Sequence, residues 1–275
     1  EAIASQWAGF APLSGIPGTV GAAPVQNIGA YGAEVAELIA SVRAWDRLRN
    51  RVVWLALGEL GLAYRDSRLK RSLTDAEVGG GRLWGPTGRW VVLDATFAVR
   101  QGSLSSRVAY SQLAGALGVE LGERVPEREL REAVLELRRS KGMVLDASDH
   151  DTWSAGSFFT NPILTEDQAG SLPEDAPRFP VTDHSQVVLG TKEAPVIEGL
   201  VKTSAAWLID HAGFTKGFTV EPGASAGLST KHVLALTNRG GASGADLARL
   251  RDEIVAGVRE RYGVTLVPEP VQVGF

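Results

Sequence analysis

The sequence has 275 residues, of which 44% are hydrophobic and 22% are charged, and its formal net charge is −4. This composition is typical of a globular protein with a sizeable core, and the length favours two domains. The acidic balance argues against a nucleic-acid partner, because proteins that bind duplexes usually present a basic face.

Several absences narrow the chemistry further. The sequence has no cysteine, which excludes disulfides, thiolate zinc sites and cysteine nucleophiles. Its four histidines show no H-x-x-x-H spacing, so we expect no metal site. The longest apolar stretch, residues 52–64, is too short to cross a bilayer and no signal peptide is visible, so we expect a cytoplasmic protein without membrane insertion. The chain begins at Glu1 and its only methionine is Met143, which leads us to expect a segment upstream.

The first half of the chain predicts a glycine-rich segment followed by strands. The first thirty residues are rich in Gly, Ala and Pro, which predicts closely packed loops. Residues 39–45 and 52–57 are strand-like runs on either side of a turn at 48–50, which predicts a β-hairpin. Residues 90–99 predict another strand, and the glycine-rich residues 74–88 predict a loop before it.

The middle of the chain predicts two helices separated by an irregular region. Residues 126–139 predict a helix, with Pro126 in the first turn and an apolar stripe along one side. Residues 145–201 contain five prolines, which predicts mostly loops. A second helix is expected over 202–212, ending at Gly213.

The C-terminal part predicts a strand, a long helix and a last strand. Residues 232–237 favour a strand, and Ser243 suits the N-cap of a helix over 245–262. Residues 264–267 favour the last strand. This mixture predicts an α+β architecture, with a domain boundary near Lys141.

Four segments combine residue types in a way that can carry chemistry. Residues 13–32 can present bare backbone N–H groups to an anion or a flat ring, or can form a simple loop cluster. Residues 64–70 gather three cations, as a binding cluster or as a solvated charge run. Residues 156–162 (GSFFTNP) place two aromatics beside a serine that lacks a nucleophile elbow and suits a turn equally well. Residues 268–270 (PEP) fix the backbone around Glu269, either to aim its carboxylate or to end an edge strand.

Taken in order, the motifs of this sequence resemble those of the UDP-N-acetylenolpyruvoylglucosamine reductase family. The matching motifs are SGIPG at 14–18, PVQNIGAYG at 24–32, YRDS at 64–67, GSFFTNP at 156–162, AAWLID at 205–210 and PEP at 268–270. The resemblance extends from about Leu13 to Gly274. Tyr110, which precedes the helix predicted over 126–139, resembles the form of the family that has a tyrosine-bearing substrate loop.

The resemblance implies a fold and a reaction. The fold is a vanillyl-alcohol-oxidase/PCMH-type FAD-binding domain plus a smaller α+β substrate-binding domain. Residues 1–141, joined by 266–275, are then expected to form the FAD-binding part, and residues 142–265 the substrate-binding domain. The implied enzyme is a monomer in peptidoglycan synthesis, and thus in cell-wall biogenesis, cell shape and cell division. It uses FAD as cofactor and NADPH as reductant to convert UDP-N-acetylglucosamine enolpyruvate to UDP-N-acetylmuramate.

Individual roles follow from the resemblance, position by position. Ser157 resembles the proton donor, and Arg65 and Glu269 resemble the pair that polarises the substrate carboxylate. These types suit the reaction, because a guanidinium and a carboxyl group can stabilise negative charge that develops during hydride addition. The positions that resemble cofactor contacts are Ser14, Ile16, Pro17, Gly18, Gly21, Ala22, Asn27, Gly29 and Tyr31. Those that resemble substrate contacts are Tyr110, Lys141, Asn161, Lys202, Lys216 and His232.

One departure from the family affects the cofactor. The family has a further N-terminal segment with a Gly-rich loop for the FAD pyrophosphate, and this sequence contains no such loop, so we expect that segment to be missing. Phe179 also stands near a position where the family is expected to have a tyrosine. Two other interpretations stay open: a non-catalytic fragment that binds a UDP-sugar, and another flavin oxidase of the same fold group. The oxidase is disfavoured because it would need no proton donor at Ser157.

Overall fold

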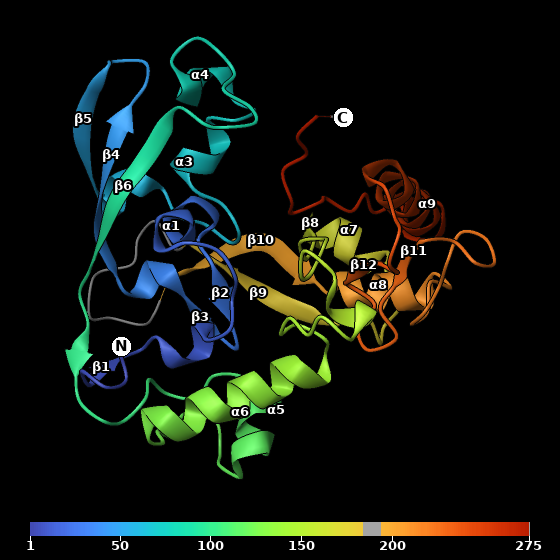
Figure 1. Cartoon of the computed structure of the whole chain (residues 1–275), viewed down its shortest axis with the longest axis horizontal. Coiled ribbons are helices and arrows are strands. Elements are labelled where there is room, and N and C mark those ends of the chain that lie inside the picture. Colours follow the sequence, from blue (N-terminus) through green and yellow to red (C-terminus); the bar gives the residue numbers. More distant parts are fainter. Residues whose placement is uncertain (184–193, 275) are drawn as a thin grey trace. The chain divides into compact units, whose positions relative to one another are not determined.

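The computed structural model describes residues 1–183 and 194–274 of the chain (Figure 1). The chain divides into two compact units. Unit 1 comprises Glu1–Leu137 with Thr182–Pro195, and unit 2 comprises Arg138–Val181 with Val196–Phe275. The division thus falls slightly before Lys141, where the sequence analysis placed it, and the C-terminal residues belong to unit 2.

Unit 1 contains a three-stranded antiparallel sheet. Its order is β5–β4–β6, with β4 at Ile39–Asp46, β5 at Arg51–Ala56 and β6 at Trp90–Phe97. The predicted hairpin and the strand predicted over 90–99 are therefore confirmed. Alternate residues such as Val42 and Leu55 are buried on one face, in a core completed by Leu60 and Leu69 from two short helices.

Short elements surround this sheet. Before it lie β1 (Trp7–Ala8), η1 (Ala11–Leu13), η2 (Val20–Ala22), α1 (Ala23–Gln26), β2 (Gly29–Ala30), β3 (Ala33–Glu34) and η3 (Val35–Glu37). Between β5 and β6 lie α2 (Leu57–Leu60), α3 (Arg68–Arg71) and α4 (Ala76–Gly79). The prediction of a plain loop over 74–88 is therefore wrong in part. Asp75 caps α4, because its carboxylate accepts the backbone N–H groups of Glu77 and Val78 at 2.8 and 3.2 Å.

The next elements along the chain are β7 (Arg100–Gln101), α5 (Ser111–Leu117) and α6 (Glu127–Ser140), and the last three residues of α6 lie beyond the division. The helix predicted over 126–139 is confirmed by α6. Its apolar stripe is buried through Leu130 and Val134, which form a core cluster with Leu113 and Ala114 of α5. At the start of α6, the Glu127 carboxylate accepts the backbone N–H of Gly9 at 2.6 Å.

Unit 2 contains a second three-stranded sheet, which the sequence did not predict. Its order is β8–β10–β9, with β8 at Ile163–Thr165, β9 at Arg178–Thr182 and β10 at Val196–Thr203. The helix α7 (Glu166–Gly170) follows β8 directly, so the expectation of mostly loops over 145–201 is wrong in part. The helix predicted over 202–212 begins later, because Lys202 and Thr203 end β10 and Ser204 caps α8 (Ala205–His211).

The rest of unit 2 consists of the helical turn η4 (His150–Thr152), the strand pair β11 (Ala226–Leu228) and β12 (Leu236–Asn238), and α9 (Gly244–Tyr262). The long helix is confirmed, and Ser243 caps it through a reciprocal box with Asp246. The strand predicted over 232–237 is confirmed only at its end. Within the part of the chain described, none of the helices has the length and apolar character needed to span a membrane.

The C-terminal segment departs most from the prediction. Residues 264–267 form no strand; instead Val264 and Leu266 are buried in the core of unit 2. The expectation that 266–275 joins the first part of the chain also differs from the structure. The Thr160 N–H donates to the Val267 carbonyl at 3.0 Å and the Glu269 N–H donates to the Phe158 carbonyl at 2.8 Å. These hydrogen bonds attach the end of the described chain to unit 2.

Candidate active site

An apolar cavity of about 600 Å³ opens beside the glycine-rich segment of unit 1. Its lining includes five of the residues that resemble cofactor contacts: Ser14, Ile16, Pro17, Gly18 and Ala22. Gly18 has a φ of +107°, and a Cβ at this position would meet no atom within 4 Å, so its backbone borders open space. Cavities of roughly 300–1,000 Å³ with mostly apolar walls accommodate ligands of drug size. The residues present therefore fit a flat, largely apolar group such as a flavin ring.

Two of the predicted cofactor residues connect the glycine-rich segment to the rest of unit 1. Asn27 is 0% exposed, and its side-chain amide donates to Glu34 Oε2 at 2.7 Å and to the Ala63 carbonyl at 2.8 Å. Its Oδ1 accepts the Ala36 N–H at 3.1 Å. Gly21 rests on β6, since a Cβ there would lie 3.5 Å from Val92 Cγ1. The Asn27 side chain therefore fixes the shape of the segment from inside the protein.

Arg65 approaches the same segment, although 36 residues separate it from Gly29. It occupies a tight turn in which Ala63 and Asp66 pair, with a φ of +53° that is uncommon for arginine. Its guanidinium donates to the Gly29 carbonyl at 2.5 Å and to the Asn27 carbonyl at 3.5 Å. A Cβ on Gly29 would lie 2.7 Å from Arg65 Nη1 and 2.9 Å from the Ala33 carbonyl oxygen, so the backbone leaves room only for glycine there. Two motifs that are separate in the sequence thus form one structure.

The predicted tyrosine loop also contacts this segment. The rings of Tyr31 and Tyr110 meet edge to face, with centroids 5.7 Å apart. Gly32 packs against Ala109, where a Cβ would lie only 3.0 Å away. Tyr110 is the residue before the first turn of α5 and remains partly exposed. Unit 1 therefore brings Tyr110 and Arg65 to the glycine-rich segment that carries Tyr31.

In unit 2, the segment that carries Ser157 lies between two other stretches of backbone. On one side the Phe158 N–H donates to the Leu234 carbonyl at 2.7 Å. On the other side the Phe158 carbonyl accepts the Glu269 N–H at 2.8 Å. Gly156, with a φ of +77°, allows the turn that precedes Ser157. The backbones of Ser157 and Glu269 are therefore neighbours, within one unit.

Three predicted substrate residues form a cationic cluster in unit 2. Burial, reinforced by the charges of Lys141 and Lys216, lowers the pKa of His232 to about 4. Burial, together with the neighbouring Arg138, also lowers the pKa of Lys141. Each of these shifts reflects positive charge that lacks full hydration, and an anionic ligand would relieve it. The Lys141–Lys216–His232 cluster is therefore a candidate site for a phosphate-bearing group.

The other predicted substrate residues of unit 2 lie on the β8–β10–β9 sheet and its connections. Asn161 Oδ1 accepts the N–H of Ala205 at 3.0 Å, which supports the first turn of α8. Lys202 lies on β10 opposite Ile163 of β8. Phe179, which stands near a position expected to hold a tyrosine, is exposed on β9.

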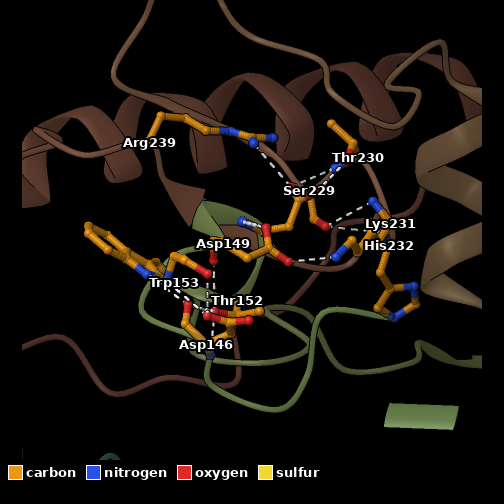
Figure 2. A network of polar contacts seen from close by, with 11 residues as sticks. Asp146, Asp149, Thr152, Trp153, Ser229, Thr230, Lys231, His232 and Arg239 are labelled. Atoms are coloured by element: carbon orange, nitrogen blue, oxygen red, sulfur yellow. Dashed lines mark hydrogen bonds and ion pairs between the residues drawn. The ribbon is translucent and has the colours of Figure 1, made fainter. Parts of the chain in front are cut away.

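The acidic residues of η4 and its surroundings were not among the residues predicted from the sequence. Figure 2 shows a polar network that links Asp149 and its neighbours in η4 to the turn from Ser229 to His232. Lys231 Nζ lies 2.5 Å from Asp149 Oδ2, and the buried Asp151 carboxylate accepts the Thr230 N–H at 2.9 Å. The only signal in the sequence is a pair of acids around His150, just before the GSFFTNP motif. No local pattern pairs them with a turn about eighty residues later.

Known proteins share this fold. The crystal structure of UDP-N-acetylenolpyruvylglucosamine reductase from Thermus caldophilus matches 98% of this chain and 65% of its own, with a TM-score of 0.54 and 21% identity. A family model described as the UDP-N-acetylenolpyruvoylglucosamine reductase C-terminal domain matches residues 147–273. The fold is therefore the one seen in that crystal structure, and residues 147–273 match the C-terminal domain of the family model.

Curated relatives show the family directly. The UDP-N-acetylenolpyruvoylglucosamine reductase of Cutibacterium acnes is 50% identical over 100% of this chain, which spans 64% of that protein. That of Streptomyces coelicolor is also 50% identical, over 97% of the chain and 64% of its own length. That of Thermobifida fusca is 48% identical over 97% of the chain and 68% of its length. The chain belongs to the UDP-N-acetylenolpyruvoylglucosamine reductase family, and it spans about two thirds of the length of these relatives.

Proposed function

We propose that this chain supplies the flavin-ring site, the substrate site and the proton donor of a UDP-N-acetylenolpyruvoylglucosamine reductase. The enzyme would reduce UDP-N-acetylglucosamine enolpyruvate to UDP-N-acetylmuramate with NADPH as reductant. The observation that carries the proposal is the backbone pairing of the Ser157 segment with Glu269, in the same unit as the Lys141–Lys216–His232 cluster. Family membership supports it.

The reacting end of the substrate is an enolpyruvyl ether with a carboxylate. In the proposed reaction a hydride reaches its terminal methylene carbon, and negative charge spreads to the neighbouring carbon and the carboxylate. Arg65 would meet that carboxylate with its guanidinium fork, and Glu269 would stabilise the developing charge. The Ser157 hydroxyl would then give its proton to the neighbouring carbon, a transfer that requires a strongly basic acceptor at hydrogen-bonding distance.

The nucleotide end of the substrate carries a diphosphate. Lys141 and Lys216 would neutralise it, and the uncharged His232 imidazole would donate one hydrogen bond. Tyr110, Asn161 and Lys202 are proposed as further substrate contacts. A UDP-linked substrate and NADPH place the reaction in the cytoplasm.

Unit 1 is proposed to be the second subdomain of a PCMH-type FAD-binding domain, and unit 2 to be mainly the substrate-binding domain. The cavity lined by Ser14, Gly18 and Ala22 would hold the flavin ring. When bound, FAD supplies the hydride after NADPH has reduced it. The apolar walls of the cavity would exclude water from the ring.

Replacement of Ser157 by alanine tests the proposed chemistry. We expect Ser157→Ala to lower the rate of UDP-N-acetylmuramate formation by about 10²- to 10⁴-fold, because general-acid catalysis contributes on this scale. The affinity for UDP-N-acetylglucosamine should stay near that of the parent, because this nucleotide sugar lacks the enolpyruvyl group. The measurements are product formation and calorimetric binding.

Ser154→Ala is the matched control. Ser154 lies three residues earlier in the same loop, where its hydroxyl accepts the Gly156 N–H at 3.2 Å. The control should turn over at close to the parental rate. If Ser157→Ala turns over as fast as Ser154→Ala, Ser157 is not the proton donor.

A second candidate is a non-catalytic fragment that binds a UDP-sugar through unit 2. It is favoured by the observation that the chain spans 64% of the length of the Cutibacterium acnes and Streptomyces coelicolor relatives. Such a fragment would bind UDP-N-acetylglucosamine and retain no flavin. Visible flavin absorbance of the chain after incubation with FAD and gel filtration separates the two candidates. Another flavin oxidase is disfavoured, since it would need neither Ser157 nor the cationic cluster.

A further inference from the structure

The carboxylate of Asp151 is buried and is held by hydrogen bonds and an ion pair. Asp151, in η4, is 5% exposed. Its oxygens accept the N–H of Thr230 at 2.9 Å and the hydroxyl of the same residue, and Arg239 Nη1 lies 3.0 Å away. A carboxylate is costly to bury unless it is paired and hydrogen-bonded in this way.

Thr230 belongs to a short turn that carries His232 and that also binds the backbone next to Lys216. In this Ser229–His232 turn, Ser229 Oγ accepts the N–H groups of Lys231 and His232 at 3.0 and 3.3 Å. The Ser229 carbonyl accepts the N–H of Gly217, the residue after Lys216, at 3.2 Å. The positions of Lys216 and His232 therefore depend on the same turn.

The third member of the cluster is attached to the other side of Asp151. Gly142, the residue after Lys141, packs so closely that a Cβ would lie 2.9 Å from the Asp151 carbonyl oxygen. Its φ of +67° also favours glycine. Through Gly142 on one side and Thr230 on the other, Asp151 connects the backbone of Lys141 to the Ser229–His232 turn.

We propose that Asp151 is a positioning residue that sets the spacing of Lys141, Lys216 and His232 for the diphosphate of a UDP-linked substrate. The proposal rests on the proposed function and extends it to a residue outside the predicted site. Because Thr230 and Arg239 occupy its oxygens, we assign Asp151 no contact with the substrate. It acts by holding the cations in place before the substrate arrives, which removes the cost of ordering them on binding.

The test is Asp151→Asn, assayed for the steady-state constants with the enolpyruvyl substrate and by calorimetry with UDP-N-acetylglucosamine. Asparagine keeps the shape but loses the charge and one acceptor. We expect KM and the Kd for UDP-N-acetylglucosamine to rise together by about tenfold to a hundredfold. Loss of a charge-assisted hydrogen bond, or displacement of a binding group, weakens binding on this scale. The kcat should change by less than about threefold, since ground-state binding is what is lost. Asp151→Glu, which keeps the charge, should recover part of the affinity.

Asp146→Asn is the control. Asp146 lies in the same network, but its carboxylate accepts only from Ser148 within the described residues. It should leave KM unchanged. If Asp151→Asn does not fold, Thr230→Val removes the hydroxyl donor and should raise KM in the same direction by a smaller factor.

The outcomes separate this proposal from the proposed function. Three results would overturn the positioning role while the reductase activity stands. The first is an unchanged KM in Asp151→Asn, or in Thr230→Val should Asp151→Asn not fold. The others are a fall in kcat alone and a rise in KM in Asp146→Asn equal to that in Asp151→Asn. A parent chain that neither binds UDP-N-acetylglucosamine nor turns over overturns the proposed function itself, and the positioning role with it.

Discussion

His232 illustrates how surroundings set the chemistry of a single residue. Burial and the nearby Lys141 and Lys216 lower the pKa of its imidazole to about 4, so it is uncharged at neutral pH. The positive charge of the cluster then comes from the lysines, while the imidazole offers one hydrogen-bond donor and one acceptor. The sequence alone could name this histidine by resemblance but could not show its protonation state.

The lowered pKa of His232 predicts a loss of stability in mild acid. Its pKa is about 4 in the folded protein against the ordinary histidine pKa of 6.5, so between these values the unfolded chain binds more protons. The free energy of unfolding should therefore fall as the pH drops from 6.5 toward 4, by about 3 kcal/mol at most. Urea unfolding of His232→Gln across this range should show a flatter pH profile than the parent.

His211→Gln serves as the comparison. His211 is exposed and stacks on Trp207 with centroids 4.0 Å apart. Its removal should leave the acid-dependent part of the profile as it is in the parent. An acid loss in His232→Gln equal to that of the parent would show that another group is responsible.

For the other residues, the sequence could suggest a role only where the signal is local and not where the partner lies far along the chain. Ser157 and Glu269 lie in motifs that resemble those of a family, and the lysines stand at positions that resemble its substrate contacts; their roles stay predictions. The inward-facing amide of Asn27 and the carboxylate of Asp151 could not be predicted, because their partners, such as Ala63 and Thr230, lie 36 and 79 residues away. A single sequence carries no record of such pairings.

At the level of elements, one buried ion pair joins the strands of the unit 1 sheet. Asp46 ends β4, and Arg89 directly precedes β6; Arg89 Nη2 lies 2.7 Å from Asp46 Oδ2, with side chains 7% and 1% exposed. Burial alone would raise the pKa of Asp46, but hydrogen bonds from Arg89 and from the backbone of Arg49 and Leu48 outweigh it, and the pKa is lowered. The carboxylate thus holds both the hairpin turn and the neighbouring strand.

Asp46→Asn should destabilise the protein by about 3–5 kcal/mol, because it leaves the Arg89 charge buried without its partner. Asp94→Asn is the matched control on the same sheet. Asp94 pairs with Arg43 at 2.5 Å, but the two side chains are 42% and 43% exposed, and such pairs contribute at most about 1 kcal/mol. Equal urea midpoints for the two variants would contradict this account.

Elements with a local signal were predicted, and elements that depend on distant partners were not. The β4–β5 hairpin, α6 and α9 each have their periodicity, caps or turn within one stretch of sequence. The β8–β10–β9 sheet pairs Thr165 with Leu200, across a region whose prolines indicate loops. The alternation of Val264 and Leu266 reflects burial in the core of unit 2, and alternation cannot distinguish burial from strand pairing.

At the scale of the whole molecule, the described chain carries two separate sets of groups. Unit 1 holds an apolar cavity beside a glycine-rich segment and Arg65, and unit 2 holds Ser157, Glu269 and the cationic cluster. The sequence predicted the α+β class and the family, both of which are confirmed. It could not predict that the C-terminal residues attach to unit 2, because that depends on hydrogen bonds to residues more than a hundred positions earlier.

The most direct test of the proposed function is the oxidation of NADPH by this chain in the presence of FAD. We predict that oxidation depends on UDP-N-acetylglucosamine enolpyruvate and that one UDP-N-acetylmuramate forms for each NADPH consumed. NADPH oxidation that proceeds at the same rate without the enolpyruvyl substrate, or no oxidation with both FAD and substrate present, would contradict the account.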